Sequence, residues 1–595
     1  MNILYIITIL AVFTLFMLIH KTEKKQNLIG WMAITTILTM CYNVLLSLIF
    51  SFIGILCTLL TLSICNAVVI AILAAILIKR KKIQKYYVKI ADIIFSVILL
   101  ILVIFTAYEQ YGFPFKVKYE ITDGSTHYYY AEKFYETSEL LYKGTNEDLF
   151  GLYDSDFRLP GAYVNEGILF KAFDGIVSKI SLFVIFDLVV LYISGILFYQ
   201  LLRTYGKDNK TMQILSAVFA ILYLVGYQLN SMIYGFVYLS LALDMTIAFL
   251  LLMGSYQKER IHKKIALPIL GMLSFGIFFS YAYFIPIIYL GIIIDIAIKA
   301  AINDEDVITK NNVITTVSVV IIPLILGLIY FIILPNISGI DTEIATMAVE
   351  GVIYENYITN LLAFIPMIVL GVIALVKNKK IEYNLSTIIL GLAIIFVIIL
   401  FAGNKLNLVS NYYCFKAYYI IWLLVMYNAY MMINNAIQDK NKILRISTYA
   451  YTGIYVVAIV ISTVLMKNIG INDIFHNNIE RITADRQILN NGELEILRES
   501  EKLTKKEQLY VLNSKYEGKM KWMTVLFDKQ QIYEDANNES ETTIAKWLEE
   551  KEEKYYLAYN EDYKMIDKKY DGLDENSEQY KIIYENEYGF ILERK

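Results

Sequence analysis

Long runs of apolar residues, separated by short polar segments, occupy the first 466 residues of the chain. A helix of about 20 apolar residues crosses the roughly 30 Å hydrocarbon core of a bilayer. About fourteen such runs can be counted, at residues 2–19, 29–51, 54–78, 90–107, 179–202, 212–229, 233–254, 265–281, 283–299, 313–334, 357–376, 384–402, 413–434 and 445–466. The pattern predicts a polytopic all-α membrane protein. The join FSYAYFIP, between the eighth and ninth runs, fits either a turn between two spans or a kink within one.

The loops between the runs differ in their content of Lys and Arg. Basic segments fall on alternate loops: HKTEKK, KRKKIQK, RTYGKDNK, QKERIHKK, KNKK and QDKNK. Because cytoplasmic loops are enriched in Lys and Arg, these loops are predicted to be cytoplasmic. The first apolar run precedes its charges and lacks a cleavage site, so it is expected to be a spanning helix with an extracytoplasmic N-terminus. The expected location is the plasma membrane of a bacterium, since the richness in Ile, Lys, Asn and Tyr is typical of an AT-rich bacterial genome.

This topology predicts four parts: N-terminal transmembrane helices (1–107), a large external loop with an interfacial helix (108–178), the remaining transmembrane helices (179–466) and an external soluble α/β domain (467–595). The tail is the one long polar segment with mixed periodicity. KEQLYVLNS and EKYYLAY are typical of strands, KMKWMTVLFDKQ and TTIAKWLEEKEE of helices, and YKIIYENEYGFILER of a terminal hairpin.

Composition excludes several classes of protein. With 57% hydrophobic and 18% charged residues the chain cannot be soluble as a whole, and a net charge of −3 gives no reason to expect nucleic-acid binding. The four cysteines lie in or beside apolar runs, without the spacing of a disulfide framework or a metal site. The chain has no P-loop, no GxGxxG after a strand and no GxSxG. It also has no cytosolic domain large enough for a nucleotide-sugar enzyme.

The stretch ITDGSTHYYYAEKF, residues 121–134, has helical spacing and would begin near Asp123 or Ser125 as N-cap. The tyrosine face would lie on the bilayer surface. Asp123 and His127 would then be one turn apart, and the positive end of the helix would favour the ionised form of Asp123. Such a carboxylate could take a proton from an acceptor hydroxyl that attacks an activated carbon on a membrane lipid. The competing interpretation is that Asp123 only caps the helix and His127 is a surface residue.

Three segments together resemble a known family: DGSTH (Asp123, His127), RLPGAYVNEG (158–167) and NKLNLVSNYYCFKAYYIIWLL (404–424). The chain is similar in these segments, and in its overall layout, to the bacterial C-fold (GT-C) glycosyltransferases. The resemblance implies a polyprenyl-phosphate sugar as donor, an inverting hexosyl transfer and Asp123 as the base. The sequence departs from the family in having three extra spans before the large loop, and in a second external loop, QLNSMIYG, without an acidic residue.

A leaving phosphate gathers negative charge and needs positive groups beside it. Lys405 and Lys416 flank the external start of the thirteenth run, with Tyr412 and Tyr413 next to them. A lysine one turn inside a span is costly unless it reaches the interface or meets an anion, so Lys416 is a candidate ligand of the donor phosphate. An ordinary interfacial belt of Lys and Tyr is the alternative. Arg158 is a further, less constrained candidate.

Other acidic residues are candidates for a second site. Glu166 follows the Pro-Gly segment and, with Asp156, could form an acceptor or second acidic site. No cofactor is firmly expected, but Asp154 and Asp156 have the Asp-x-Asp form of a site for Mg²⁺ or Mn²⁺. Asp244 lies within a span and should face the bundle interior, either as a proton relay or substrate contact or as a carboxyl satisfied by nearby Tyr and Ser.

The leading hypothesis is a membrane glycosyltransferase of polysaccharide biosynthesis in the cell envelope. It would transfer a sugar from polyprenyl phosphate to an envelope glycan, lipid or protein on the extracytoplasmic face. A flippase or transporter of lipid-linked saccharides is the alternative, because about fourteen spans suit it as well. An envelope scaffold is the third possibility.

Overall fold

The computed structural model describes residues 2–19, 25–80, 83–112, 122–141, 148–149, 152–153, 159–207, 209–303, 306–338, 357–377, 384–465 and 467–484, and in the tail 492, 494–496, 498–499, 509–511, 522, 525, 555–559 and 580–595. The chain divides into two compact units, each described by itself. The helical unit comprises Met1–Ala107, Ala131–Tyr142 and Phe157–Thr483. The second unit comprises Tyr108–Tyr130, Lys143–Asp156 and Ala484–Lys595.

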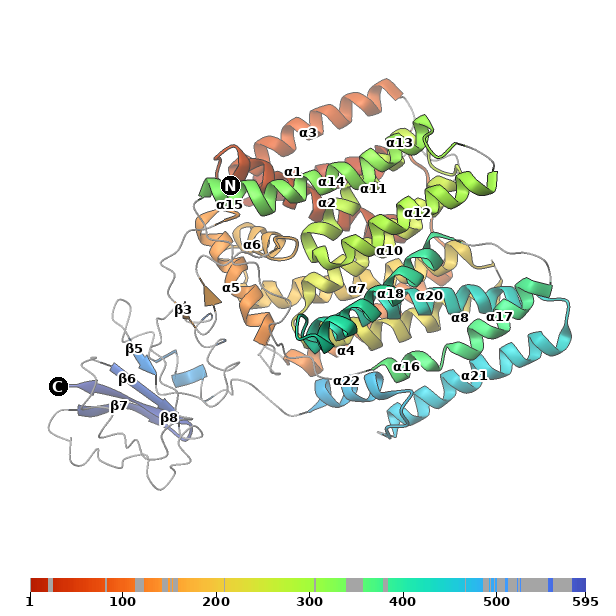
Figure 1. The fold of residues 1–595 in the computed structure, drawn as a ribbon. Coiled ribbons are helices and arrows are strands. Elements are labelled where there is room, and N and C mark those ends of the chain that lie inside the picture. Colours follow the sequence, from red (N-terminus) through yellow and green to blue (C-terminus); the bar gives the residue numbers. More distant parts are fainter. Residues whose placement is uncertain are drawn as a thin grey trace. The chain divides into compact units, whose positions relative to one another are not determined.

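Helices make up nearly all of the helical unit (Figure 1). In chain order they and the short strands among them are α1 (Asn2–Ile19), β1 (Gln26–Asn27), α2 (Leu28–Phe52), α3 (Leu59–Arg80), β2 (Tyr86–Tyr87), α4 (Ile90–Tyr111), α5 (Thr122–Thr137), β3 (Asp148–Leu149), β4 (Leu152–Tyr153), α6 (Tyr163–Ala172), α7 (Lys179–Tyr205), α8 (Lys210–Tyr223), η1 (Leu224–Gln228), α9 (Leu229–Ile233), α10 (Val237–Gln257), α11 (Lys263–Tyr281), η2 (Ala282–Phe284), α12 (Ile285–Asn303), α13 (Lys310–Thr316), η3 (Val317–Ile321), α14 (Ile322–Leu328), η4 (Ile329–Ile333), α15 (Leu334–Ser338), α16 (Ile358–Leu362), α17 (Ile365–Lys377), α18 (Leu385–Lys405), α19 (Asn411–Lys416), α20 (Tyr418–Ile437), α21 (Lys442–Val464) and α22 (Asp473–Thr483). α4 and α5 each continue from one unit into the other, and β3 and β4 belong to the second unit.

The predicted fold class is confirmed. Among the described residues, 13 helical segments are long and apolar enough to cross a membrane, so the chain is a multi-pass membrane protein. One of them, Lys263–Ile302, has 40 residues, which is about twice the length needed to cross the hydrocarbon core. It is interrupted at Tyr281, whose φ of −153° and ψ of 85° are not helical.

The interruption at Tyr281 decides between the turn and the kink that the sequence left open. α11 packs against α10 and α14, whereas α12 packs against α18. The 3₁₀ turn η2 therefore joins two separate spans. With this segment counted as two, the 13 segments become the fourteen spans expected from the apolar runs.

Polar contacts join the ends of helices that the Lys and Arg pattern assigns to one side. At the basic end of the bundle, which holds the Lys/Arg-rich loops, these are Gln26 N to Lys85 O (3.1 Å), Lys207 N to Asn434 Oδ1 (3.1 Å) and Lys263 Nζ to Asn311 Oδ1 (3.2 Å). At the opposite end, called the aromatic end below, they are Gly161 N to Phe279 O (2.9 Å), Tyr283 Oη to Tyr413 O (3.4 Å) and Ile474 N to Asn360 Oδ1 (3.3 Å). Helix ends that the Lys and Arg pattern assigns to the same side of the membrane therefore lie together in the structure.

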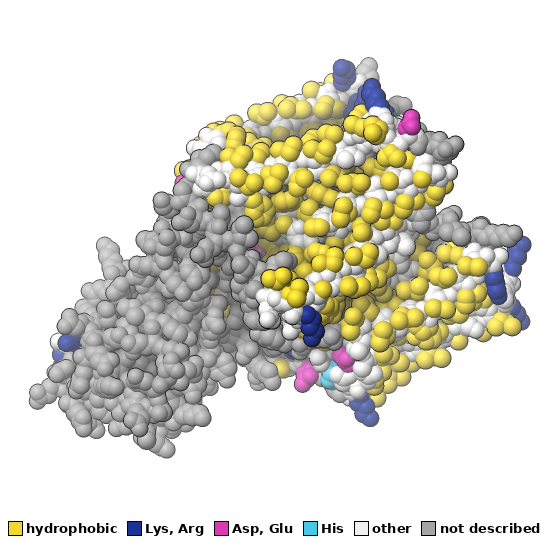
Figure 2. Space-filling view, in the orientation of Figure 1, with side chains coloured by type: hydrophobic (Ala, Val, Ile, Leu, Met, Phe, Trp, Pro, Cys, Tyr) yellow, Lys and Arg dark blue, Asp and Glu magenta, His cyan; other side chains and the backbone are white. Residues whose placement is uncertain are grey.

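The bundle has a packed centre and an apolar outer surface. α10 is buried along almost its whole length, while α1 and α3 expose most of their side chains. Figure 2 shows hydrophobic side chains covering the flanks of the helices, with Lys and Arg mainly near the helix ends. Apolar flanks of this extent suit contact with lipid tails. Small residues allow close packing inside: a Cβ on Gly371 of α17 would lie 2.5 Å from Cα of Met432 in α20.

The second unit contains a four-stranded sheet. Its strands are β5 (Leu509–Val511), β6 (Tyr555–Tyr559), β7 (Tyr580–Asn586) and β8 (Gly589–Arg594), in the order β5-β6-β8-β7. β5 and β6 are parallel, and β7 and β8 form an antiparallel hairpin. The strands lie where the sequence predicts strands and a terminal hairpin. The two helices predicted in the tail fall mostly outside the described residues.

α5 forms where a helix was expected, but its first three tyrosines are buried in protein and do not lie on a surface. Tyr128, Tyr129 and Tyr130 are buried, with 4%, 5% and 8% of their surface exposed. The ring of Tyr128 lies 6.0 Å from that of Trp522 in the tail. The expected membrane-surface face therefore packs against protein, because tyrosine rings can fill a core as well as an interface.

Candidate functional site

The helix that begins at Lys210 breaks before it reaches the aromatic end. α8 passes into the π-helical turn η1, in which Gly226 has φ −80° and ψ −118°, outside the helical range. Such a break takes backbone carbonyls out of their helical hydrogen bonds. No water is present at membrane depth to replace those bonds, so irregular backbone there needs other protein groups.

Asn478 of α22 supplies hydrogen bonds at the break. Its Nδ2 donates to the carbonyl oxygens of Val225 and Gly226, both at 2.8 Å. Its Oδ1 accepts from Asn230 Nδ2 at 2.8 Å, and Asn230 Oδ1 accepts from Tyr419 Oη at 2.7 Å. One fully buried side chain thus connects the broken helix, α22 and α20.

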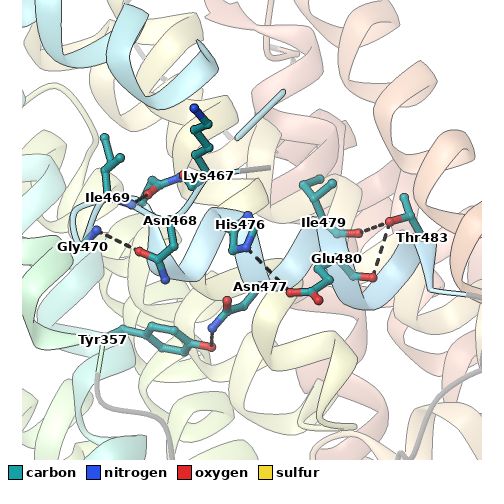
Figure 3. A network of polar contacts seen from close by, with 11 residues as sticks. Tyr357, Lys467, Asn468, Ile469, Gly470, His476, Asn477, Ile479, Glu480 and Thr483 are labelled. Atoms are coloured by element: carbon teal, nitrogen blue, oxygen red, sulfur yellow. Dashed lines mark hydrogen bonds and ion pairs between the residues drawn. The ribbon is translucent and has the colours of Figure 1, made fainter. Parts of the chain in front are cut away.

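Further contacts fix α22 at the aromatic end (Figure 3). Before the helix, Gly470 N donates to Asn468 Oδ1 at 2.8 Å, and Gly470 has φ +76°, a conformation that favours glycine. Within the helix, Asn477 Nδ2 donates to Tyr357 Oη at 3.2 Å. α22 is thus held near its start by the bond from Ile474 N to Asn360 Oδ1, and farther along by Asn477 and Asn478.

Lys416 lies among aromatic side chains, with 3% of its surface exposed. Its Nζ is 4.0 Å from the ring centroids of Phe236 and Tyr412 and 5.1 Å from that of Tyr238. Nζ also donates to the hydroxyl oxygens of Tyr238, at 2.5 Å, and of Tyr412. Desolvated cation–π contacts are worth about 2 kcal/mol. They fix the ammonium group and do not neutralise it. Phe236, Tyr238, Tyr412 and Lys416 are called the Lys416 cage below.

More tyrosines extend the cage toward the turn between α11 and α12. The ring centroid of Tyr281 lies 5.8 Å from that of Tyr238 and 5.6 Å from that of Tyr283, which lies 5.9 Å from that of Tyr413. The buried hydroxyl of Tyr281 has no hydrogen-bond partner among the described residues. Leaving such a group without a partner costs about 1–3 kcal/mol, so an acceptor oxygen brought by a ligand would be favoured there.

Arg481, in the last turn of α22, lies against the loop between α9 and α10. Its Nη1 donates to Tyr234 Oη at 2.6 Å, and its Cζ is 5.0 Å from the Tyr234 ring centroid. The Tyr234 ring stacks on Phe236 of the cage, with centroids 5.8 Å apart and planes inclined by 15°. Gly235 between them has φ +73°, which lets the chain turn sharply enough to place both rings together.

The structure unites part of the predicted donor-phosphate set. Tyr412 contacts Lys416 directly, and Tyr413 packs beside Tyr412 with ring centroids 5.2 Å apart. Lys405, the last residue of α18, is exposed and has no contact with the cage among the described residues. Arg158 lies outside the described residues, as do Asp154 and Asp156 of the acidic candidates.

Asp123 and His127 lie one turn apart in α5, as predicted, with Asp123 in the first helical turn. Both are partly exposed and both belong to the second unit. The helical unit takes over from Ala131 onward. There Gly167 of α6 approaches α5 so closely that a Cβ on it would lie 2.7 Å from the Ala131 carbonyl oxygen.

Glu166 is fully buried in α6, and neither of its carboxyl oxygens has a hydrogen-bond partner among the described residues. Burial, and then the nearby carboxyl of Asp187 in α7, hold the pKa of Glu166 well above its usual range. Its neighbour Asn165 has a structural task instead: its Oδ1 accepts from Asn43 Nδ2 at 3.1 Å, and its Nδ2 donates to Gly161 O at 2.9 Å. Burial therefore favours the protonated form of this carboxyl over the ionised form.

Asp244 of α10 lies in a polar cluster within the bundle. Its Oδ1 accepts hydrogen bonds from Ser194 Oγ at 2.5 Å and from Gln228 Nε2 at 3.3 Å. Gln228 also donates to Tyr223 Oη at 2.8 Å. Ser194 and Gln228 thus satisfy one carboxyl oxygen, and Gln228 links it to Tyr223, whereas Oδ2 has no hydrogen-bond partner among the described residues.

Within the described part of the chain, no group of three or more His, Cys, Asp or Glu side chains is arranged to hold a metal ion. The four described cysteines, Cys41, Cys57, Cys65 and Cys414, are free thiols.

Comparisons with known proteins give matches among solved structures. No protein-family model matches the chain, and no curated protein gives a significant match. Among solved structures, the crystal structure of the Archaeoglobus fulgidus oligosaccharyltransferase in the apo form matches 79% of this chain and 69% of its own, with 12% sequence identity and a TM-score of 0.47. At this level of likeness, the activity has to be argued from the side chains.

The variant Asn478→Ala is expected to lower the thermal stability of the protein. It leaves the partly buried Val225 carbonyl, the buried Gly226 carbonyl and Asn230 without their partner, at about 1–3 kcal/mol for each buried unsatisfied group. Thermal unfolding in detergent micelles, followed by size-exclusion chromatography, measures the effect. Asn477→Ala, which removes one partly buried hydrogen bond from the preceding residue, is the control. Equal midpoints for Asn478→Ala and the wild type would show that the break is stabilised elsewhere.

The variant Glu166→Gln is expected to raise stability at neutral pH. The pKa of Glu166 is higher in the folded state than its ordinary value of 4.5. The contribution of this carboxyl to stability is therefore fully present below pH 4.5, and it is lost as the pH rises through the folded-state pKa. The amide carries no charge, so the variant should exceed the wild type in midpoint at pH 7.5 and approach it at pH 5. The exposed Glu139→Gln serves as control. A gain that is the same at both pH values would contradict the burial argument.

Proposed function

We propose that the chain is an integral-membrane glycosyltransferase that transfers a sugar from a polyprenyl-phosphate donor to a cell-envelope acceptor. The observation that carries the proposal is the Lys416 cage at the aromatic end of the bundle. A lipid-linked donor carries its phosphate at the depth of the interface, where this end of the helices lies in a bilayer. A fixed ammonium group beside hydroxyl donors there is the arrangement that a phosphate ester requires.

The chemistry assigned to the cage is stabilisation of the leaving group. As the bond between the anomeric carbon and the phosphate oxygen breaks, the electron pair stays on the phosphate, whose negative charge grows. Lys416 supplies a fixed positive charge for it, and the hydroxyl of Tyr281 supplies a hydrogen-bond donor. Groups that are already oriented stabilise this charge without reorganising during the reaction.

Asp123 is proposed as the general base, from its place in the first turn of α5. It takes the proton of the acceptor hydroxyl as that oxygen attacks the anomeric carbon. A single displacement of this kind inverts the configuration at that carbon. His127, one turn later, is proposed to orient Asp123 or to contact the acceptor. The aromatic end is proposed to face the extracytoplasmic side of the plasma membrane, because the Lys- and Arg-rich loops lie at the other end.

The variant Lys416→Met is expected to abolish sugar transfer by removing the charge beside the leaving phosphate. The assay uses the purified protein in vesicles that contain a labelled polyprenyl-phosphate sugar, and it scores both glycosidic product and movement of label across the bilayer. Lys416→Arg keeps the charge and should retain measurable activity. Movement of the labelled lipid by the wild type without any glycosidic product would overturn the enzyme in favour of a flippase.

The variant Asp123→Asn is expected to lose transfer by at least about a hundredfold, the usual scale for a general base, while donor binding stays unchanged. The amide keeps the shape of the side chain but cannot accept the proton. Native mass spectrometry of the variant with the donor lipid measures binding, and product formation measures transfer. Glu139→Gln is the control for a change of charge nearby on the chain. Full activity of Asp123→Asn would assign the base to another residue.

A further inference from the structure

The polar cluster around Asp244 lies inside the bundle, about two turns from the start of α10. It brings together three spans. Asp244 belongs to α10 and Ser194 to α7, while Tyr223 and Gln228 lie at the break in the sixth span. The hydrogen bonds described above connect these four side chains. None of the four has exposed surface, so the carboxyl group of Asp244 has no contact with solvent.

Three oxygen atoms in or beside this cluster have no hydrogen-bond partner among the described residues. They are Asp244 Oδ2, Gln228 Oε1 and Ser240 Oγ. Ser240 lies four residues before Asp244 in α10, so the two side chains are on the same face of that helix. A buried polar atom without a partner lowers stability. Several such oxygens around one carboxyl group indicate a ligand that oxygen atoms bind, which is a cation.

The charge of Asp244 also needs a partner, because an ionised carboxylate inside a membrane bundle is costly unless it is paired or binds a metal. In the part of the chain that the structure describes, no Lys, Arg or His side chain forms an ion pair with Asp244. A proton on the carboxyl would remove the charge, but it would make only one hydrogen bond. A metal cation removes the charge and contacts several oxygens at once.

The cluster matches a cation with a single charge. The hydrogen bonds of Asp244 lead to neutral side chains only, Ser194 and Gln228, so one carboxylate has to balance the ion. A divalent ion would leave an excess positive charge inside the bundle, which is as costly there as the unpaired carboxylate.

The break in the sixth span is a favourable place for such an ion. Gln228 is the last residue of the π-helical turn η1, and Gly226 of this turn has dihedral angles outside the helical range. Interrupted spans are where many membrane proteins bind Na⁺, because an irregular segment offers oxygen atoms at a depth where a regular helix offers few.

We infer that this cluster is a sodium site, with Asp244 Oδ2, Gln228 Oε1 and Ser240 Oγ as its side-chain ligands. The ion joins α10 to the broken span, while Asn478 of α22 binds the backbone carbonyls of the same break. Sodium therefore stabilises the broken span itself. The inference does not depend on the donor lipid of the proposed function.

The test uses the purified full-length protein in detergent micelles. Equilibrium binding of radioactive sodium gives the Kd, and thermal unfolding is compared in NaCl and in choline chloride at equal ionic strength. The wild type is expected to bind one sodium ion per chain. Its midpoint should rise with the logarithm of the Na⁺ concentration, by roughly 3 °C at about a hundred times the Kd. Acidification should weaken binding, because protons compete for the carboxylate.

Three variants separate this site from general effects of salt. Asp244→Asn removes the charge and should abolish both sodium binding and the shift in midpoint. Gln228→Met removes one oxygen ligand at similar length and should weaken binding about tenfold, the scale of one contact to a charged group. Asp187→Asn removes another buried carboxyl, in α7, and should keep the full response as the matched control.

The inference is overturned if the wild type binds no radioactive sodium, or if Asp244→Asn binds it as well as the wild type does. A wild-type midpoint that responds to acidification and not to Na⁺ would assign a proton to Asp244 in place of sodium. Equal losses of sodium binding in Asp187→Asn and Gln228→Met would likewise contradict the assigned ligands.

Discussion

The hydrogen bonds that Asn478 makes at the break in the sixth span are the constraint on which the aromatic end depends. A transmembrane helix normally satisfies its own backbone, and a break in it is stable only where other groups take the freed carbonyls. Asn478 does so for Val225 and Gly226 and at the same time binds Asn230. Because that side chain belongs to a helix that follows the last span, the end of the bundle is closed by a segment far away in sequence.

This dependence explains why the loop after α9 can hold two aromatic rings in a fixed stack. The rings of Tyr234 and Phe236 would gain little by themselves, since one aromatic pair contributes about 0.5–1.5 kcal/mol beyond its buried area. Anchoring the helix on one side and α22 on the other restricts the conformations of this loop. Side chains that are fixed in this way give the preorganised arrangement that the proposed donor site requires.

The membrane architecture was predictable because hydrophobic runs of fixed length have only one common solution in a bilayer, a spanning helix. The turn at Tyr281 was visible as an alternative, and packing of α12 on α18 resolved it. Lys416 could be singled out because a lysine inside a span is costly. The residues that contact Lys416 could not be predicted from the sequence. Phe236 and Tyr238 lie about 180 residues earlier, and their pattern is that of ordinary interfacial aromatic residues.

Other features were hidden because their signals are local while their partners are distant. Arg481 lies in an amphipathic polar segment, where a charged residue normally indicates a solvated face. Only the structure shows that its guanidinium group contacts Tyr234. The tyrosines after His127 were assigned to the membrane surface, yet they pack in protein, because the ring of Tyr128 meets Trp522 nearly four hundred residues later. Composition and periodicity report the tendency of a residue to leave water, but they do not tell lipid from protein as its destination. For the aromatic rings and cations at this end of the bundle, only contacts between distant segments make that distinction.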